Sequence, residues 1–322
     1  MSGANPQVSV VVPLYNKAAW VTRCLGSVLR QSWRDFEILV VDDGSTDASV
    51  GLVEAFDDPR IGLIRKQNGG AASARNRGMR SASGEYIAFI DADDEWNPDH
   101  LQVLLAAMHA YPEAVAACDE YRGEGFSFAG GIGGDVVPIP VASLPEPVRS
   151  HGFDYVHQLC AGRFVTSCSS TMVRASLLSE CGIEFDETLR RGEDLNFWVR
   201  LSRQGDFVYC EFDGARYHRD DATSEMNRRR AGVEPTPDIF RGLSEQEFEP
   251  EELVHIRRFL RREYLKQAFQ NRGLPFDAKE MVRGALSGNS AVDGLAYRAV
   301  RFAPERAMDA AKRARKWLGL GA

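Results

Sequence analysis

Acidic side chains follow two of the apolar stretches in the first hundred residues. Asp42 and Asp43 come directly after the run FEILVV, and Asp91, Asp93 and Asp94 follow the run YIAFI. Hard divalent cations prefer oxygen ligands, and Mg²⁺ is typically held by one or two carboxylates together with substrate phosphates. Asp residues also cap helices and fill turns, so a short Asp-x-Asp pattern alone leaves both interpretations open. The pattern indicates a candidate site for a divalent cation and a phosphate-bearing substrate.

The segments around these carboxylates alternate between strand and helix patterns. Apolar runs predict strands at residues 7–14, 36–41, 60–65 and 86–90. Helical patterns lie between them, at residues 18–32, 46–56 and 71–81. Strands that alternate with helices form a parallel sheet covered on both faces, and ligands bind beyond the carboxyl ends of its strands. We therefore expect the acidic turns, and the glycine turn at Asn68-Gly69-Gly70, at one edge of an α/β sheet.

The composition is that of an ordinary globular protein. The chain has 322 residues, 44% of them hydrophobic and 26% charged, which excludes a disordered chain, a collagen-like repeat and a small disulfide scaffold. The formal net charge is −7, so we expect no nucleic acid among the partners. The six cysteines form no C-x-x-C pair and are expected to be reduced, mostly buried thiols. No secretory signal or long apolar run is visible, and this predicts a cytoplasmic protein.

The chain changes character after the predicted sheet segments. We expect one domain over residues 1–220 and a helical region over residues 221–322, with a long helix at 250–271. Residues 123–150 are rich in Gly and Pro, which is typical of a disordered insertion or of a functional loop over a site.

The C-terminal segment is basic. Residues 295–322 carry seven basic and two acidic side chains, and residues 304–318 read PERAMDAAKRARKWL. On a helical wheel, Ala and Leu side chains share one face, and most of the Lys and Arg side chains lie opposite. The pattern predicts a basic amphipathic helix that either lies on an anionic membrane surface or packs on the acidic body of the protein.

Four segments stand in an informative order along the chain. They are VVPLYNKAAWVTRCLGSVLRQSWRDFEILVVDDGSTD, NGGAASARNRGM, GEYIAFIDADDEWNPDHL and FDETLRRGEDLNFWVRL. In order and spacing they resemble glycosyltransferase family 2, and the resemblance spans about residues 8–218. It implies the GT-A fold, which is a Rossmann-like, mostly parallel sheet with helices on both faces, here followed by a C-terminal helical extension.

The resemblance implies which residues bind the nucleotide sugar. Pro13 and Tyr15 match the loop that lies against the nucleotide base, and Asp43 matches the carboxylate that hydrogen-bonds the base edge. Gly70 and Arg75 match the segment that meets the phosphates or the sugar of the donor. From the pattern alone, Tyr15 could instead close the core, and Arg75 could instead pair with an acidic residue at the surface.

The resemblance also implies metal ligands and a catalytic base. Asp93 matches the metal-binding carboxylate, Asp91 its partner on the ribose or metal side, and His218 the position of a third metal ligand. Asp194 matches the catalytic base, with Glu193 beside it as an orienting group. Two alternatives stay open: Asp194 could simply stabilise a helix N-terminus, and His218 could be a packed or surface residue.

By the same resemblance, the protein is expected to be a metal-dependent inverting glycosyltransferase with Mg²⁺ or Mn²⁺ as its cofactor. It would move one sugar from a nucleotide-diphosphate sugar, expected to be a UDP-sugar, to a hydroxyl of a glycan or lipid-linked glycan, as in surface-polysaccharide assembly. Residues 123–150 are then expected near the acceptor, and the basic tail could hold the enzyme peripherally on the inner face of a membrane.

Missing motifs narrow the alternatives. The chain has no Q-x-x-R-W motif of processive family members, and it has neither a P-loop nor a dinucleotide-binding glycine motif after a strand. This favours transfer of a single sugar. A sugar-phosphate nucleotidyltransferase and a non-catalytic nucleotide-binding or membrane-docking scaffold remain as alternatives.

Overall fold

The computed structural model describes residues 5–123, 126–128, 136–163, 165–189, 192–218, 239–240 and 243–259, with the backbone alone at 126–128 and 245. The chain divides into two compact units, Met1–Asn227 and Arg228–Ala322. In the second unit, residues 250–259 are helical, as predicted. The rest of the helix predicted at 250–271, and the predicted amphipathic helix at 304–318, lie outside the described residues.

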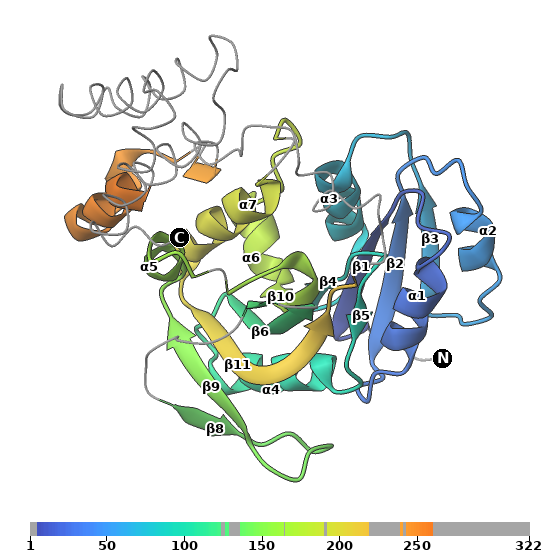
Figure 1. Cartoon of the computed structure of the whole chain (residues 1–322), viewed down its shortest axis with the longest axis horizontal. Helices are drawn as coiled ribbons and strands as arrows, with labels where there is room; N and C mark the ends of the chain where they lie inside the picture. Colours follow the sequence, from blue (N-terminus) through green and yellow to red (C-terminus); the bar gives the residue numbers. More distant parts are fainter. Residues whose placement is uncertain are drawn as a thin grey trace, which may run out of the picture. The chain divides into compact units, whose positions relative to one another are not determined.

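The first part of the chain alternates strands and helices as the sequence predicts. The elements are β1 (Val8–Leu14), α1 (Val21–Leu29), β2 (Phe36–Asp42), α2 (Ser49–Glu54), β3 (Ile61–Arg65), α3 (Ala71–Ser81) and β4 (Tyr86–Phe89). The four strands are parallel in the order β3-β2-β1-β4, with Val8 of β1 opposite Phe36 of β2 (Figure 1). The predicted α/β fold is confirmed.

The second part extends the same sheet with strands of both directions. Its elements are β5 (Glu95–Trp96), α4 (His100–Ala110), β6 (Ala116–Gly123), β7 (Phe126–Phe128), β8 (Val137–Ile139), β9 (Val148–Phe153), α5 (Tyr155–Cys160), η1 (Cys168–Ser170), β10 (Thr171–Arg174), α6 (Ala175–Glu180), α7 (Glu193–Leu201), η2 (Ser202–Gln204) and β11 (Phe207–Arg216). Strand β10 lies antiparallel between β4 and β6, and β11 runs parallel to β6. Short β5 pairs with the end of β11, so the turn after β4 lies beside the C-terminal end of β11.

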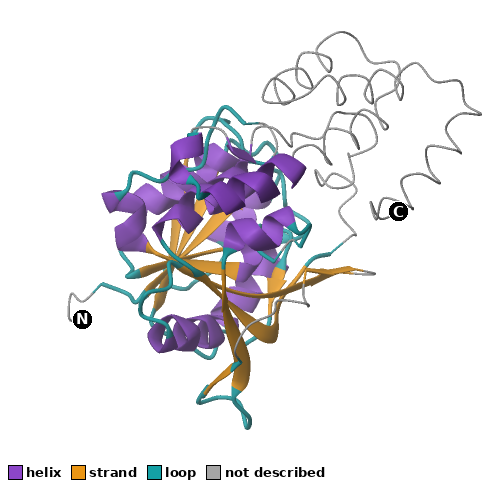
Figure 2. Cartoon of the chain, turned by 90° about the vertical axis from the view of Figure 1, so that its left-hand side faces the viewer, coloured by secondary structure: helices purple, strands orange, loops and turns teal. Residues whose placement is uncertain are grey.

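Helices cover the sheet on both faces (Figure 2). Alternate residues of a strand point to opposite faces, and in β1 Val8, Val10 and Val12 join a core formed with α1 and α4. Helix α3 packs on β1 and β2 from the other side. There Gly78 lies so close to β1 that an added Cβ would stand 2.4 Å from Val11 Cγ1. The fit of α3 against β1 therefore depends on a residue without a side chain.

The Gly- and Pro-rich region at 123–150 contributes β7, β8 and the start of β9, and residues 140–147 form a turn between β8 and β9. Strand β7 pairs with β6, and β8 pairs with β9, which pairs with β11. Residues 124–125 and 129–135 lie outside the described residues. In its described parts the region thus combines strands of the sheet with a loop, and its predicted position near the acceptor stays a prediction.

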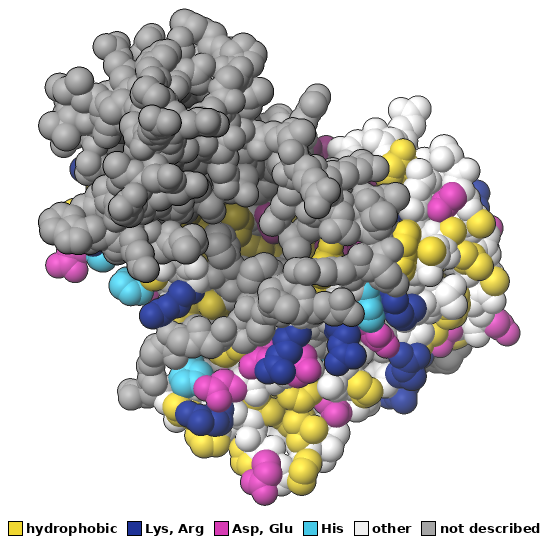
Figure 3. Space-filling model, viewed as in Figure 1, with side chains coloured by type: hydrophobic (Ala, Val, Ile, Leu, Met, Phe, Trp, Pro, Cys, Tyr) yellow, Lys and Arg dark blue, Asp and Glu magenta, His cyan; other side chains and the backbone are white. Residues whose placement is uncertain are grey.

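Charged side chains of both signs lie side by side on the face shown in Figure 3. The ion pair Arg122–Glu120 lies within β6, and Arg149–Glu211 joins β9 to β11. Pairs this exposed contribute at most about 1 kcal/mol to stability.

All six cysteines are free and five of them are buried, which confirms the prediction of reduced, mostly buried thiols. In the part of the chain that is described, no helix has the length and apolar character needed to cross a membrane.

Candidate active site

The loops after β1 and β2 are tied together at the carboxyl edge of the sheet. Asn16 has a positive φ of 52°, and its Oδ1 accepts a hydrogen bond from Thr46 N at 2.8 Å. The backbone N–H of Lys17 donates to Ser49 Oγ at 2.8 Å, and that of Ala18 donates to Asp47 Oδ2. These bonds turn the chain sharply before α1 begins. Tyr15, just before the turn, is 48% exposed and therefore does not close the core.

Asp42 and Asp43 hold the turns around them. Asp42 Oδ1 accepts from Ser45 N at 2.9 Å, which is the geometry of a turn-forming Asp. Asp43 is 2% exposed, and its carboxylate accepts from the backbone N–H groups of Gly69 and Gly70 at 2.9 and 2.7 Å and from Lys66 Nζ. Asp43 therefore fastens the glycine turn that opens α3, and a contact with a nucleotide base stays a prediction. Gly70 takes φ 89°, a conformation that suits glycine.

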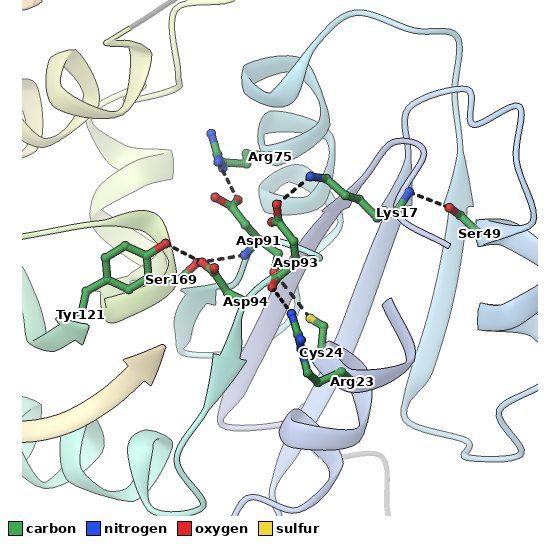
Figure 4. A network of polar contacts seen from close by, with 10 residues as sticks. All are labelled: Lys17, Arg23, Cys24, Ser49, Arg75, Asp91, Asp93, Asp94, Tyr121 and Ser169. Atoms are coloured by element: carbon green, nitrogen blue, oxygen red, sulfur yellow. Dashed lines mark hydrogen bonds and ion pairs between the residues drawn. The ribbon is translucent and has the colours of Figure 1, made fainter. Parts of the chain in front are cut away.

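The turn after β4 gathers three carboxylates and three cationic side chains (Figure 4). Asp91 Oδ1 accepts from Arg75 Nη2 at 2.7 Å, and Asp93 Oδ2 accepts from Lys17 Nζ at 2.6 Å. Arg23 Nη2 donates to the backbone carbonyl of Asp93 at 3.0 Å. Arg75 on α3 and Lys17 after β1 thus reach the same acidic turn from two elements. The family resemblance indicated Arg75 but did not indicate Lys17.

Asp94 bonds to other partners than Asp91 and Asp93 do, and these partners hold the turn in place. It is fully buried, and its Oδ2 accepts from Ser169 Oγ at 2.5 Å and from Tyr121 Oη at 2.9 Å. Ser169 Oγ also accepts from Asp91 N at 3.0 Å. Burial, together with the charges of Asp91 and Asp93, raises the pKa of Asp94 well above its usual range. Asp94 is therefore a supporting residue of the turn.

The chemistry of the acidic turn suits a divalent cation. Burial raises the pKa of Asp93, and the neighbouring charge of Asp91 raises it further, although Lys17 opposes both. Two carboxylates that repel each other in a partly buried turn gain from an added positive charge. Carboxylate oxygens are also the ligands that Mg²⁺ and Mn²⁺ prefer. Asp91 and Asp93 therefore fit a metal ion. Among the described residues no group of three or more His, Cys, Asp or Glu side chains is already gathered to hold one.

His218 lies near this turn but contacts Glu95 instead. Its Nε2 is 3.2 Å from Glu95 Oε2, in a pair formed because β5 runs beside the end of β11. Glu95 follows the acidic turn by one residue. The structure thus brings His218 to the same end of the sheet as Asp93, and its role as a metal ligand stays a prediction.

The first turn of α7 brings a second acidic pair to the site. Gly192 precedes the helix with φ 71°, and Glu193 and Asp194 are its first residues. Glu193 Oε1 lies 3.3 Å from Arg75 Nη1, so Arg75 joins this turn to Asp91. Arg75 is 5% exposed, which excludes a simple surface ion pair. Asp194 is half-buried, and Leu195 N donates to its Oδ1 at 2.8 Å. Burial raises the pKa of Asp194.

Several residues of this arrangement were not singled out from the sequence. The sequence analysis did not name Lys17 and Lys66. Each is a basic residue within three positions of a strand end at the acidic edge, and this position could have indicated a partner for a carboxylate. Pro13, which was singled out, lies half-buried opposite Val41 in the β1–β2 register. Arg75, Asp91 and Glu193 form one connected cluster, and Asp93 and Asp194 lie within its electrostatic reach.

The sheet, with its four parallel strands and its helices on both faces, is that of the GT-A fold. The chain belongs to glycosyl transferase family 2, because the model of that family matches residues 9–182. The predicted family is confirmed.

Two relatives illustrate the similarity. The chain is 30% identical to the uncharacterized glycosyltransferase EpsJ of Bacillus subtilis, over 68% of this chain and 62% of EpsJ. It is 43% identical to the putative colanic acid biosynthesis glycosyl transferase WcaA of Escherichia coli, over 61% of this chain and 66% of WcaA. The chain therefore covers less than two thirds of the length of either relative.

Two solved structures share the fold. S. aureus TarS in complex with UDP-GlcNAc superposes with a TM-score of 0.61 at 19% identity, over 92% of this chain and 90% of that chain. The mannosyltransferase PcManGT of Pyrobaculum calidifontis, in complex with GDP-Man and Mn²⁺, superposes with a TM-score of 0.56 at 19% identity, over 98% of this chain and 84% of that chain. At this identity the two structures support the fold.

Proposed function

We propose that this protein is a metal-dependent inverting glycosyltransferase that moves one sugar from a nucleotide-diphosphate sugar to a hydroxyl acceptor. The observation that carries the proposal is the position of Arg75, whose guanidinium lies 2.7 Å from Asp91 and 3.3 Å from Glu193. One buried side chain thus joins the acidic turn after β4 to the first turn of α7. A donor bound at the turn and a base at the helix would then stand in a fixed relation, which catalysis by proximity requires.

Asp194 is the proposed base. Its carboxylate takes the proton from the acceptor hydroxyl, and the hydroxyl oxygen forms a bond to the anomeric carbon as the bond from that carbon to the diphosphate breaks. The bonding electrons leave with the diphosphate, and the configuration at the anomeric carbon inverts. A raised pKa makes Asp194 a stronger base than an exposed Asp, and general-base catalysis contributes about 10²- to 10⁴-fold in rate.

The remaining residues bind and orient the donor. Asp91 and Asp93 would hold Mg²⁺ or Mn²⁺, with His218 as the candidate third ligand. When bound, such an ion neutralises the charge that develops on the departing diphosphate. Arg75 adds a fixed positive charge beside Asp91. Exposed Tyr15 offers an aromatic face to the nucleotide base.

The similar proteins support a choice of donor and acceptor to test. The solved relatives hold UDP-GlcNAc in one case and GDP-Man with Mn²⁺ in the other, so a UDP-sugar is the first donor to test and a GDP-sugar the second. The name of WcaA refers to colanic acid biosynthesis, which supports a glycan or lipid-linked glycan as the acceptor. A lipid-linked acceptor would place the enzyme at the periphery of a membrane.

The proposal is tested by binding and by nucleotide release. Calorimetry measures the binding of UDP and GDP with Mn²⁺ or with EDTA, and a coupled assay measures nucleotide release from UDP-GlcNAc and GDP-mannose. We expect wild-type protein to bind one nucleotide more tightly with Mn²⁺, and Asp93→Asn to lose that difference. Asp194→Asn should lower nucleotide release about 10²- to 10⁴-fold while nucleotide binding changes little.

Exposed Asp57 provides the control. Asp57→Asn removes one carboxylate outside the site and should leave binding and release unchanged. Equal nucleotide affinity with Mn²⁺ and with EDTA in the wild type would refute the metal-dependent part of the proposal. Release retained within a few-fold in Asp194→Asn would remove Asp194 from the role of base.

A further inference from the structure

Asn76, the residue after Arg75, uses its whole side-chain amide to hold one distant segment. It is 1% exposed on α3. Its Nδ2 donates to Phe185 O and to Glu187 Oε1, both at 2.9 Å, and its Oδ1 accepts from Phe185 N at 2.8 Å. One amide therefore satisfies both backbone polar groups of Phe185, as a neighbouring strand would. Buried backbone groups need such partners, so the position of this segment is set by Asn76.

The held segment is packed against the helix that carries Asp194. The ring of Phe185 stacks on that of Phe197 with centroids 4.0 Å apart and planes 4° from parallel. Phe197 is a residue of α7, three positions after Asp194, which places the two on the same side of the helix one turn apart. A shift of Phe185 would therefore move or tilt the first turns of α7.

Helix α3 thus reaches the two halves of the site through adjacent residues. Arg75 contacts Asp91 and Glu193 by charge, and Asn76 contacts the segment under α7 by hydrogen bonds. The helix itself is fixed on the sheet by the close approach of Gly78 to Val11. Arg80, one turn further along α3, also pairs with Glu184 at 2.7 Å, next to the held segment.

We propose that Asn76 is a positioning residue for the reaction: it sets the place of Asp194 relative to the donor by holding Phe185, on which α7 packs. The inference rests on the proposed function, since it takes Asp194 as the base. Asn76 itself touches no reacting atom. Its loss should therefore lower the rate constant of the chemical step and leave nucleotide binding unchanged.

The first test is a double-mutant cycle with the base. Asn76→Ala and the isosteric Asn76→Asp are each made in the wild type and in Asp194→Asn, and nucleotide release from UDP-GlcNAc and GDP-mannose is measured with Mn²⁺. A displacement of about 1 Å can cost about 10²-fold in rate, so we expect a 10- to 100-fold lower kcat in the wild-type background. In the Asp194→Asn background the same substitutions should have almost no effect, because residues that act through one group are not additive.

Ser9→Ala is the matched control. Ser9 is also fully buried, and its Oγ accepts from Ser83 N and Gly84 N at 3.1 and 2.9 Å, at the end of β1 opposite to the site. Ser9→Ala should lower the Tm as Asn76→Ala does, but change kcat little. An equal loss of kcat from Asn76→Ala with and without Asp194, or a weakened affinity for UDP and GDP, would show a general structural role and overturn the inference.

A second measurement separates the inference from the proposed function. Hydrogen exchange of the full chain reports the mobility of the backbone without any activity. Asn76→Ala and Asn76→Asp should speed exchange in peptides from Phe185 to Leu201, and Ser9→Ala should not. If the wild type released no nucleotide from either sugar, the proposed function would fail, and this result would still show whether Asn76 holds α7. Unchanged exchange in those peptides would overturn the inference by itself.

Discussion

Lys17 Nζ lies 2.6 Å from Asp93 Oδ2, with both side chains largely buried. In this arrangement a lysine ammonium neutralises the carboxylate that is the proposed metal ligand. A metal ion at Asp93 therefore has to compete with Lys17 or share the carboxylate with it. The structure also explains why Lys17 stands there: its backbone N–H is fixed by Ser49, and its Nζ lies 5.3 Å from the ring centroid of Trp20.

We expect Lys17→Met to tighten Mn²⁺ binding to the nucleotide-free protein. Hydrogen bonds to a charged group contribute about 1.5–3 kcal/mol, so removal of this competitor should raise the affinity about tenfold or more. Calorimetric titration with Mn²⁺ at pH 8 measures the change. Arg60→Met, which removes a cation paired with Asp58 before β3, is the control and should leave the affinity unchanged. Mn²⁺ binding no tighter than in the wild type would argue against competition.

The raised pKa of Asp194 has a consequence for the pH dependence of the reaction. The base must be ionised to accept a proton, so the rate falls as the pH falls through its pKa. Because burial raises that pKa, the acidic limb of kcat should lie above about 3.9, the usual value for Asp. The measurement is nucleotide release against pH at saturating Mn²⁺ and donor. A rate that stays constant down to pH 4 would contradict the assignment.

Gly78 and Gly51 allow a direct test of how α3 is fixed. An added Cβ at Gly78 would stand 2.4 Å from Val11 Cγ1, whereas an added Cβ at Gly51 in α2 would meet nothing within 4 Å. Gly78→Ala should therefore destabilise the protein by about 1–3 kcal/mol. Gly51→Ala should be neutral or stabilise by up to about 1 kcal/mol, because Ala favours a helix more than Gly does. Urea denaturation of both variants decides; equal effects would show that the α3–β1 contact adapts freely.

The parallel half of the sheet was predictable because each strand is a continuous apolar run that ends in a turn signal. Helix α3 matches its predicted range of 71–81, since Gly70 and Ala71 mark its start in the sequence. Helix α1 was predicted from residue 18 and begins at Val21. Residues 18–20 form a turn instead, in which Trp20 N and Val21 N both donate to Lys17 O, and the helix starts after it.

The second half of the sheet was not predictable in the same way. Strand β10 has only four residues, Thr171–Arg174, and is held between β4 and β6, which come from distant parts of the chain. Strand β11 pairs with β6 through register shifts near Asp213. Such pairings depend on tertiary contacts between distant segments, which a local sequence pattern does not indicate. The same holds in the site, where the pattern indicates Asp93 but does not indicate that Lys17 pairs with it.

Asp119, a buried acid on β6, predicts how the free energy of unfolding changes with pH. Asp119 is fully buried, and its Oδ2 lies 2.7 Å from His100 Nδ1 and against the backbone of Gly214, where an added Cβ would clash. Burial raises the pKa of Asp119 to about 6, although His100 opposes the shift. In the unfolded chain the usual value is about 3.9. Between these two values the folded protein keeps a proton that the unfolded chain has lost.

The protonated Asp119 carboxyl therefore makes its full contribution to the free energy of unfolding below about pH 4. This contribution is lost as the pH rises through 6. The difference of about two units corresponds to a loss of about 3 kcal/mol at most. Asp119→Asn keeps a hydrogen-bond acceptor for His100 but has no proton to lose. Relative to the wild type, its free energy of unfolding should thus rise by up to about 3 kcal/mol from pH 4 to pH 7. Urea denaturation at several pH values measures the difference, and exposed Asp57→Asn, which should show no such trend, is the control. A difference between Asp119→Asn and wild type that stays constant over this range would mean that Asp119 is ionised in the folded protein throughout, held by His100.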